Sequence, residues 1–401
     1  MDFTELFKQS SGQVFPSPDH RHLATVFQNR VIIRDAESLE PVLSFTATDH
    51  LSDLEWSPDG VFILACGYKS DTVYVWSVED KHWGGRVDET TVGLAGARWS
   101  PDSRHLLVYS SFDLRLTIWP LTDTEPAYIQ SPKKLEKGLG LLRGSRFIAV
   151  AQRKDFKDTI GVYDSVKWTQ LKSFPVGTLD MAGICWSPNG HYLVAWDTML
   201  EYRVQVFSSD GQILTSYSAY DAGFGVKSVC WSPGSDLLAI GSYDQKVRLL
   251  NHYTWKPLFT FTHPERVTSA PHLTIYREVD VPIPEKGSDG PPAKYEILSS
   301  SLTITSTRTD ADKPNPRLGV GLCEFDMSGQ YLVTRNDNMP QCLWIWEVER
   351  LRLRVLAQQS ASIRVARWSP TRPGLLAFVC GGNNVYLWTE RNGCECVEVP
   401  T

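Results

Sequence analysis

The sequence predicts an all-β fold built from repeated copies of one small sheet, and three observations support this prediction. The tripeptide Trp-Ser-Pro occurs five times, beginning at Trp56, Trp99, Trp186, Trp231 and Trp368. The spacing is regular, since 43 residues separate Trp56 from Trp99 and 45 separate Trp186 from Trp231. Short runs of β-branched and aromatic residues, bounded by Pro, Asp, Gly and Ser, follow each copy, which is typical of strands joined by tight turns.

Three further copies carry a worn form of the same signature. The first copy is the segment 15–19, Phe-Pro-Ser-Pro-Asp. The fourth is the degenerate segment 140–150, which lies in the gap of 87 residues between Trp99 and Trp186. The seventh begins at Phe325, 43 residues before Trp368. The chain therefore contains eight copies.

Every copy continues in the same order. In the second copy, the turn 57–60 (Ser-Pro-Asp-Gly) leads into a short apolar strand at 62–65 and then into an alternating strand at 72–76. Pro presets φ at the second position of such a turn, and Asp and Gly tolerate the backbone that follows. A further strand closes the unit, as at 41–45 in the first copy. Four strands in about 40–45 residues is the spacing of a WD40 blade.

We therefore predict a single WD40-type β-propeller over residues 1–401, because sheets arranged in a ring cover one another's faces and leave only short edges. Eight repeats indicate eight blades, or seven if one copy is used to close the ring. Terminal segments at 3–7 and 394–399 are candidates for the closing strand. We expect the large apolar residue of each signature to pack between blades as a structural residue: Trp56, Trp99, Trp186, Trp231, Phe325 and Trp368.

A Pro-rich insertion interrupts the array at residues 264–317. Trp231 and Phe325 are 94 residues apart, about twice the repeat, and the extra segment carries eight of the 24 prolines. Its middle, 282–292, is typical of a mobile loop, whereas 273–276 and 295–298 have the composition of strands. We expect an extended hairpin that projects from one blade, either as a passive insertion or as a partner contact.

Composition and charge narrow the class of partner. The formal net charge is −6 and the basic clusters are short, which argues against nucleic acid, because phosphate binding needs clustered Lys and Arg. The eight Cys include no CxxC pair, so we expect buried free thiols in a reducing compartment. We find no signal-peptide pattern and no apolar run near 18 residues, so no membrane association is expected.

No catalytic, cofactor-binding or metal-binding signature is present in the sequence. Gly-x-Ser-x-Gly, Walker and His-Glu-x-x-His motifs are absent, and the nine His are dispersed. Asp71, Asp113, Asp158 and Asp244 precede the third strands of their repeats, which favours turn-stabilising hydrogen bonds over catalysis. We predict a scaffold that is not an enzyme. An RNA- or ribonucleoprotein-binding propeller adaptor is the main alternative, and a propeller hydrolase or metal-dependent enzyme is a weaker one.

The loops on one face of the ring are the candidates for partner binding. That face gathers the connections between second and third strands and those between blades. The loops are rich in aromatic, Arg and Met side chains, which are typical of interface hot spots. The candidate partner-binding residues are Lys69, Arg153, Phe156, Asp197, Met199, Glu201, Tyr202, Tyr220, Phe224, Arg335, Asn336, Asp337 and Asn338.

The same loops carry a family resemblance. It rests on 196–202 (Trp-Asp-Thr-Met-Leu-Glu-Tyr), 216–220 (Ser-Tyr-Ser-Ala-Tyr), 251–256 (Asn-His-Tyr-Thr-Trp-Lys), 294–297, 315–321 and 335–338, together with the opening segment 3–11. From end to end, the chain resembles the centrosomal and spindle-pole family named WD repeat-containing protein eight.

This resemblance implies a function that the repeat spacing does not show. Family members bind a coiled-coil anchoring protein at centrosomes or spindle pole bodies, in fungi together with a minus-end-directed kinesin-14, and tether microtubule minus ends in the mitotic spindle. By resemblance, we expect a monomeric propeller within such a hetero-complex, in the cytoplasm and cytoskeleton, at the spindle pole body or centrosome. The ring would offer a groove or face to a helical segment of the coiled-coil partner.

Overall fold

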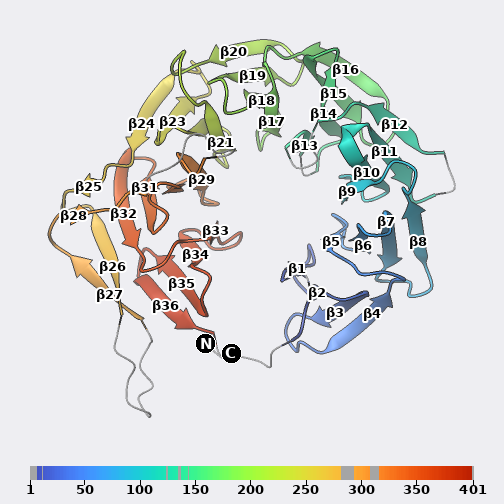
Figure 1. The fold of residues 1–401 in the computed structure, drawn as a ribbon, viewed down its shortest axis with the longest axis horizontal. Coiled ribbons are helices and arrows are strands. Elements are labelled where there is room, and N and C mark those ends of the chain that lie inside the picture. The colour runs from blue at the N-terminus through green and yellow to red at the C-terminus, as the bar shows by residue number, and fades with distance from the viewer. Residues whose placement is uncertain are drawn as a thin grey trace.

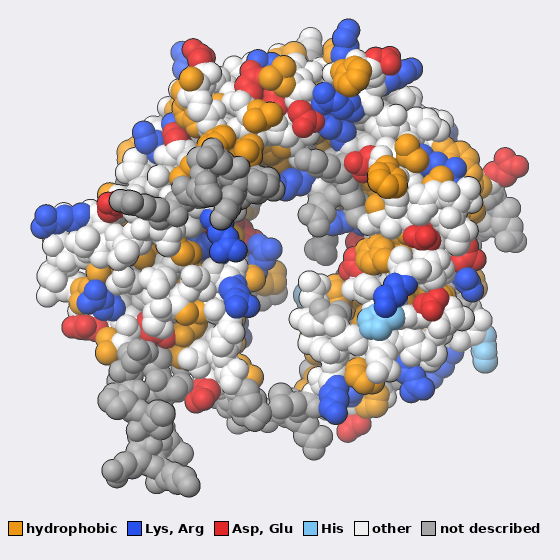
Figure 2. Space-filling model, in the orientation of Figure 1, with side chains coloured by type: hydrophobic (Ala, Val, Ile, Leu, Met, Phe, Trp, Pro, Cys, Tyr) orange, Lys and Arg blue, Asp and Glu red, His pale blue; other side chains and the backbone are white. Residues whose placement is uncertain are grey.

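The computed structural model describes residues 7–10, 12–122, 125–133, 137–142, 144–280, 293–307 and 316–399. These residues form eight radial sheets, the blades, arranged in a ring in which blade 8 comes round toward blade 1 (Figure 1). Side chains leave the centre of the ring open (Figure 2). The structure confirms the predicted all-β propeller and gives it eight blades.

Each of the first four blades has four antiparallel strands, with the first strand innermost (Figure 1). Blade 1 contains β1 (Val14–Pro16), β2 (His22–Phe27), β3 (Arg30–Asp35) and β4 (Pro41–Thr46). Blade 2 contains β5 (Asp53–Trp56), β6 (Phe62–Gly67), β7 (Thr72–Ser77) and β8 (Gly84–Asp88). Blade 3 contains β9 (Leu94–Trp99), β10 (His105–Ser110), the short 3-10 helix η1 (Ser111–Asp113), β11 (Arg115–Pro120) and β12 (Ala127–Gln130). Blade 4 contains β13 (Leu139–Leu141), β14 (Phe147–Lys154), β15 (Lys157–Asp164) and β16 (Gln170–Pro175).

The last four blades repeat this plan. Blade 5 contains β17 (Met181–Trp186), β18 (Tyr192–Asp197), β19 (Val204–Ser208) and β20 (Ile213–Tyr217). Blade 6 contains β21 (Val226–Trp231), β22 (Leu237–Ser242), β23 (Lys246–Asn251) and β24 (Pro257–Thr262). Blade 7 contains β29 (Val320–Phe325), β30 (Tyr331–Asn336), β31 (Cys342–Glu347) and β32 (Arg352–Gln358). Blade 8 contains β33 (Val365–Trp368), β34 (Leu375–Val379), β35 (Asn384–Thr389) and β36 (Gly393–Glu398).

The Ser-Pro turn between the first and second strands is held by one hydroxyl group. Ser57 Oγ donates to Asp59 Oδ1 (2.6 Å) and accepts the backbone N–H of Phe62 (2.9 Å). Gly60 then adopts a φ of +75°, a conformation that is open to glycine without steric penalty. The same pair of hydrogen bonds recurs at Ser17 in blade 1 and at Ser187 in blade 5.

The hydrophobic core lies between blades. In the described part of the chain, seven clusters of buried apolar side chains each join one blade to the next, from blades 1 and 2 through blades 7 and 8. The predicted structural residues enter the cluster shared with the preceding blade and are only 1–8% exposed: Trp56, Trp99, Trp186, Trp231, Phe325 and Trp368.

Aromatic pairs recur across these joints at one structural position. The ring on the preceding blade belongs to the first residue of its second strand. The stacked pairs are Trp56 with His22, Trp99 with Phe62, Trp231 with Tyr192, and Trp368 with Tyr331, with ring centroids 5.9–6.5 Å apart. These four joints are therefore closed by dispersion and by apolar burial at the same place in the repeat.

The joint between blades 8 and 1 is different because Pro16 stands where most other blades carry the aromatic residue. Among the described residues, no buried apolar cluster joins these two blades. Strand alternation turns Leu23, Ile32 and Leu387 toward this joint, and all three are only half-buried. This joint is therefore the least sealed of the ring.

Neither predicted closing strand pairs the two termini in the described residues. The candidate at 3–7 lies almost entirely outside them. The candidate at 394–399 is β36, which pairs with β35 of its own blade. Each blade is thus built from four strands that follow one another along the chain, and the prediction of closure by strand exchange is not supported there.

The insertion forms the predicted hairpin, but this hairpin is built into the ring. Strands β26 (Thr274–Asp280) and β27 (Ala293–Leu298) pair antiparallel, and β26 also pairs in parallel with β32, the outer strand of blade 7. Glu278 accepts hydrogen bonds from Tyr386 Oη (2.6 Å) and Ser360 Oγ (2.7 Å), so the hairpin braces blade 7 against blade 8. Beside it, β25 (Arg266–Val267) pairs with β28 (Leu302–Thr303). The predicted mobile loop at 282–292 lies outside the described residues.

Candidate functional site

The ends of the blades give the ring two distinct faces. We call the face with the Trp-Ser-Pro turns the bottom face. The top face carries the turns between second and third strands and the connections between blades. All the predicted partner-binding residues lie in top-face loops or at the strand ends beside them.

Four of the predicted residues are buried: Asp197, Tyr202, Asn336 and Asn338. The Asp197 carboxylate accepts the backbone N–H groups of Leu179 (2.8 Å) and Asp180 (2.9 Å), which ties the blade 5 turn to the connection from blade 4. Asn336 Nδ2 donates to Gln245 Oε1 (2.9 Å) across the joint between blades 6 and 7. These buried side chains hold the loops in place.

The aspartates that precede the third strands of their blades also stabilise the loops, through hydrogen bonds. Asp71 Oδ1 accepts the backbone N–H of Leu94 (2.8 Å), and Asp158 Oδ2 accepts that of Met181 (2.6 Å). Asp244 accepts hydrogen bonds from Arg248 (2.6 and 3.2 Å). A carboxylate that is engaged in this way stabilises a turn and is poorly placed to act on a substrate.

Ion pairs neutralise most of the charged candidates. Arg153 Nη1 lies 2.9 Å from Asp180 Oδ1 and 3.2 Å from Asp158 Oδ1, and buried Lys133 shares both acids. In blade 7, Asp337 bridges Arg335 (2.9 Å) and Lys227 (2.7 Å), and in blade 5 Glu201 pairs with Arg203. Lys69, on blade 2, is exposed. These networks fix the loops and leave little free charge on them.

An aromatic cluster occupies the top of the joint between blades 5 and 6. Tyr202 packs edge-on against Tyr220, with centroids 4.9 Å apart, and the Arg248 guanidinium lies 5.4 Å from the Tyr202 ring centroid. Tyr220 and Phe224 line a cavity of about 520 Å³. Burial raises the pKa of Tyr220 to about 12, so its hydroxyl stays protonated and donates to the Phe224 carbonyl (2.5 Å). Met199, half-buried beside the cluster, accepts the backbone N–H of Gly225 through its own carbonyl (2.8 Å).

A second feature of the top face is a row of exposed apolar side chains on blades 3 to 5, which we call the apolar arc. It consists of Phe112 (92% exposed), Leu114 (55%), Phe156 (90%), Leu179 (64%) and Leu200 (74%). All five lie in turns or connections of three successive blades. Large apolar side chains that are exposed on successive loops of one face are a common feature of protein interaction sites.

The backbone beneath the arc is strained. Asp155 and Phe156 form the two-residue turn between β14 and β15 with φ values of +49° and +61°, and Phe112 has φ +61°. This type of turn favours Asn-Gly, and a bulky residue in the left-handed region costs on the order of 1 kcal/mol or more. The ring therefore gives up stability to hold these phenyl groups at the tips of two loops.

Sequence reasoning identified only Phe156 of the arc. The signal for the other members was present, since 111–114 (Ser-Phe-Asp-Leu) places two large apolar residues in a polar turn. In the sequence alone, such residues fit the end of a strand as well as an exposed turn, because the turn boundaries are not known.

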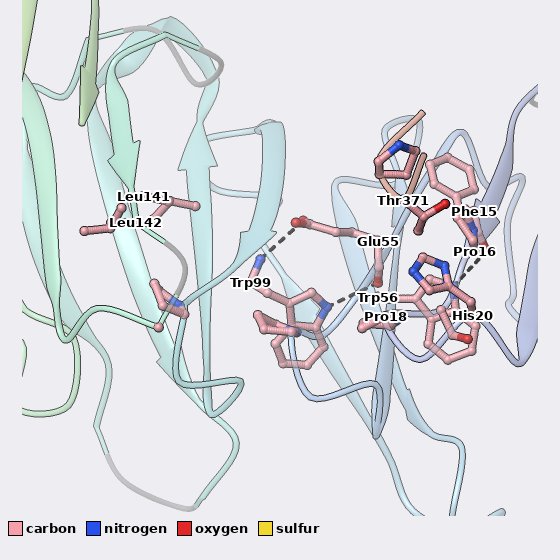
Figure 3. A pocket seen from close by; sticks show the side chains of 15 residues that line it. Phe15, Pro16, Pro18, His20, Glu55, Trp56, Trp99, Leu141, Leu142 and Thr371 are labelled. Atoms are coloured by element: carbon pink, nitrogen blue, oxygen red, sulfur yellow. Dashed lines mark hydrogen bonds between the residues drawn. The ribbon is translucent and has the colours of Figure 1, made fainter. Parts of the chain in front are cut away.

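The bottom face contains a cavity of about 710 Å³ at the mouth of the channel (Figure 3). Its walls come from the inner ends of blades 1, 2, 3, 4 and 8, which meet only around the centre of the ring. The cavity holds Glu55, whose carboxylate accepts the backbone N–H of Trp99 at 3.3 Å. Burial raises the pKa of Glu55 to about 7, an effect that Arg98 and this hydrogen bond reduce and that Asp53 increases.

In the described part of the chain, no group of three or more His, Cys, Asp or Glu side chains is arranged to hold a metal ion. No helix among these residues has the length and apolar character needed to cross a membrane.

Comparison with known proteins gives three kinds of match. The family model for the WD domain, G-beta repeat, matches residues 39–77 and 211–251. WD repeat-containing protein WRAP73 of Mus musculus is 41% identical over all of this chain and 89% of its own length. An uncharacterized WD repeat-containing protein of Schizosaccharomyces pombe is 26% identical over 94% of this chain and 78% of its own length. A crystal structure of the eukaryotic initiation factor superposes with a TM-score of 0.63 at 13% identity, over 98% of this chain and 90% of that one, which supports the fold alone.

Proposed function

Since this chain belongs to the family of WD repeat-containing protein WRAP73, we propose that it is a non-catalytic adaptor that binds a coiled-coil anchoring protein and helps to tether microtubule minus ends at the spindle pole body or centrosome. The partner and the location come from the resemblance to the WD repeat-containing protein eight family. A minus-end-directed kinesin-14 in the same complex is part of the proposal.

The observation that carries the adaptor function is the apolar arc. Large apolar side chains that are at least half exposed lie on three successive blades of the top face. An amphipathic helix presents an apolar stripe through residues spaced three and four apart, and such a stripe can cover a row of this kind. Because hot-spot energy comes from a few large apolar or aromatic anchors, we expect Phe112, Phe156 and Leu200 to carry most of the affinity.

The networks under the loops support the same function. Lys133, Arg153, Asp158 and Asp180 bind one another beside the arc, and Asp197 fixes the connection that carries Leu179. A surface that is ordered before binding loses less conformational entropy when a partner docks. The buried candidates therefore contribute to binding by preorganising the surface.

Replacement of Phe112, Phe156 and Leu200 by Asn in one variant tests the proposal. Asn tolerates the left-handed backbone, so the variant should keep its thermal stability. We expect at least a tenfold loss of affinity for the coiled-coil partner in a pull-down titration, together with loss of the protein from spindle poles in dividing cells.

The matched control is Tyr253→Asn, which removes a side chain of similar exposure (85%) from the bottom-face turn of blade 6. This control should bind the partner normally. Undiminished binding by the folded triple variant would show that the arc is not the docking surface.

A further inference from the structure

The channel mouth on the bottom face is a partly open site, and its described lining carries one carboxylate, that of Glu55. Five proline rings, Trp56 and Trp99 line part of its rim, and Leu141 and Leu142 of blade 4 face Glu55 across the opening (Figure 3). The prolines at the rim are Pro16, Pro18, Pro58, Pro101 and Pro370. A volume of about 710 Å³ is large enough for a long side chain with part of its backbone.

Glu55 lacks a counter-ion within the described residues, where no Lys, Arg or His nitrogen lies within 4.0 Å of its carboxylate. One oxygen accepts only the long hydrogen bond from the Trp99 backbone. Glu324 occupies the same place in blade 7, and there Arg367 of blade 8 pairs with it at 3.3 Å. In blade 3, Arg98 occupies the place of Arg367 without reaching Glu55.

Because Glu55 lacks the counter-ion that Glu324 has, the site favours one chemical class of ligand. A half-buried carboxylate without a partner repels anions, and a neutral apolar group would increase its desolvation. A metal ion would need several further oxygen, nitrogen or sulfur ligands, and the described lining offers one carboxylate and the exposed His20. A guanidinium group can satisfy a carboxylate with two hydrogen bonds, is weakly hydrated, and stacks on aromatic and proline rings.

We propose that the channel mouth binds an arginine side chain of a partner polypeptide, with Glu55 as its counter-ion and the proline and tryptophan rim around its aliphatic stem. This site is separate from the apolar arc and does not depend on it. Because the two sites are on opposite faces, the adaptor has room to hold two protein segments at once.

Binding should depend on pH through Glu55. With a pKa of about 7, roughly one tenth of Glu55 is ionised at pH 6 and nine tenths at pH 8, so apparent affinity should rise roughly tenfold between these values. The other groups near Glu55 are Asp53 on its own strand, Cys66 on β6, Arg98 on β9, and His20 in the cavity wall. A His20→Asn variant should keep the tenfold rise, which assigns it to Glu55.

The test uses N-acetyl-arginine methylamide as the probe and the analogous citrulline compound, which has the same shape without the charge, as its control. The full chain carries a ¹⁵N label, and the Trp99 backbone amide and the Trp56 and Trp99 indole signals are followed by NMR. We expect saturable shifts with the arginine probe and none with citrulline. Loss of at least tenfold in affinity is expected for Glu55→Gln, with an unchanged melting temperature.

The matched control is Glu324→Gln, which removes the carboxylate that already has an internal partner and should leave binding unchanged. Arg143 lies outside the described residues and stands between the lining residues Leu142 and Gly144 in the sequence, so the titration is repeated in an Arg143→Gln background. Equal shifts with citrulline, or full binding by folded Glu55→Gln, would overturn the proposal, as would a lack of response in both backgrounds.

Discussion

The last residue of each blade's innermost strand gives a sharp prediction, because blade 3 carries Trp99 at this position and blade 1 carries Pro16. Trp99 is 1% exposed, stacks on Phe62 at 5.9 Å and donates its indole N–H to the Glu55 carbonyl at 3.2 Å. Trp99→Ala removes this burial and leaves a cavity in the joint between blades 2 and 3, which costs about 3–5 kcal/mol. The lost hydrogen bond is worth about 1 kcal/mol within that range. Pro16 occupies the equivalent position of blade 1, where it seals no joint. Pro16→Ala should therefore lower the free energy of unfolding by less than about 1 kcal/mol.

Thermal unfolding and hydrogen exchange together test this difference. A chain of 401 residues has an unfolding entropy of roughly 0.8 kcal/mol per kelvin, so about 4 kcal/mol lowers the melting temperature by about 5 °C. In Trp99→Ala, faster exchange should be concentrated in β6, β9 and β10, since a joint opens locally before the ring unfolds. The reasoning would be refuted if Pro16→Ala destabilised the protein as much as Trp99→Ala, or if faster exchange spread evenly over all blades.

Four further predictions follow from individual contacts. Burial lowers the pKa of His263 to about 4 from its ordinary value of 6.5, so on acidification the unfolded chain binds a proton at this histidine before the folded chain does. The associated stability, about 3 kcal/mol, is complete above pH 6.5 and is lost as the pH falls toward 4. Urea titrations over this pH range should show a flatter profile of unfolding free energy for His263→Gln. Tyr386→Phe removes the hydroxyl that donates to Glu278 and should cost about 1–2 kcal/mol in the same titrations, with faster exchange in β26 and β36, whereas Tyr253→Phe on the open surface should be neutral. Phe156→Gly should raise the melting temperature by relieving the left-handed turn, while binding of the coiled-coil partner falls; a lower melting temperature would contradict the strain assigned to that turn. In the unmodified protein, amides of β2 and β35, which flank the least sealed joint, should exchange faster than those of β22 and β30, and equal protection would show that this joint is closed as firmly as the others.

The sequence was sufficient to predict the turns and strands within each blade. The Ser-Pro-Asp-Gly turn at 57–60 contains its own hydrogen-bonding groups, and the alternation at 72–76 defines a strand without reference to the rest of the chain. The repeat spacing then led to eight sheets, because a four-stranded sheet with two apolar faces can bury both only against neighbouring copies of itself. Even the worn fourth copy could be located, since Leu141 keeps the place of the tryptophan in the register.

The candidate site was predictable only in part, since burial is a property of the assembled ring. Asp197 and Asn336 lie in segments with the composition of a binding loop. Groups on neighbouring blades and connections, however, form hydrogen bonds with these two side chains and bury them. Phe112 and Leu200 resemble ends of strands in the sequence, and only the positions of the turns show that nothing covers them.

By itself, the amino-acid sequence determined the strands, the turns and the eight copies of the repeat, because these depend on residues within one repeat of about 43 positions, and the structure then decided between eight blades and seven. Only the tertiary structure decided which joints are sealed, how the insertion pairs with β32, and that Glu324 has a counter-ion while Glu55 does not. The physical reason is that packing and charge pairing depend on distances between blades. Those distances are fixed only when the whole ring has formed.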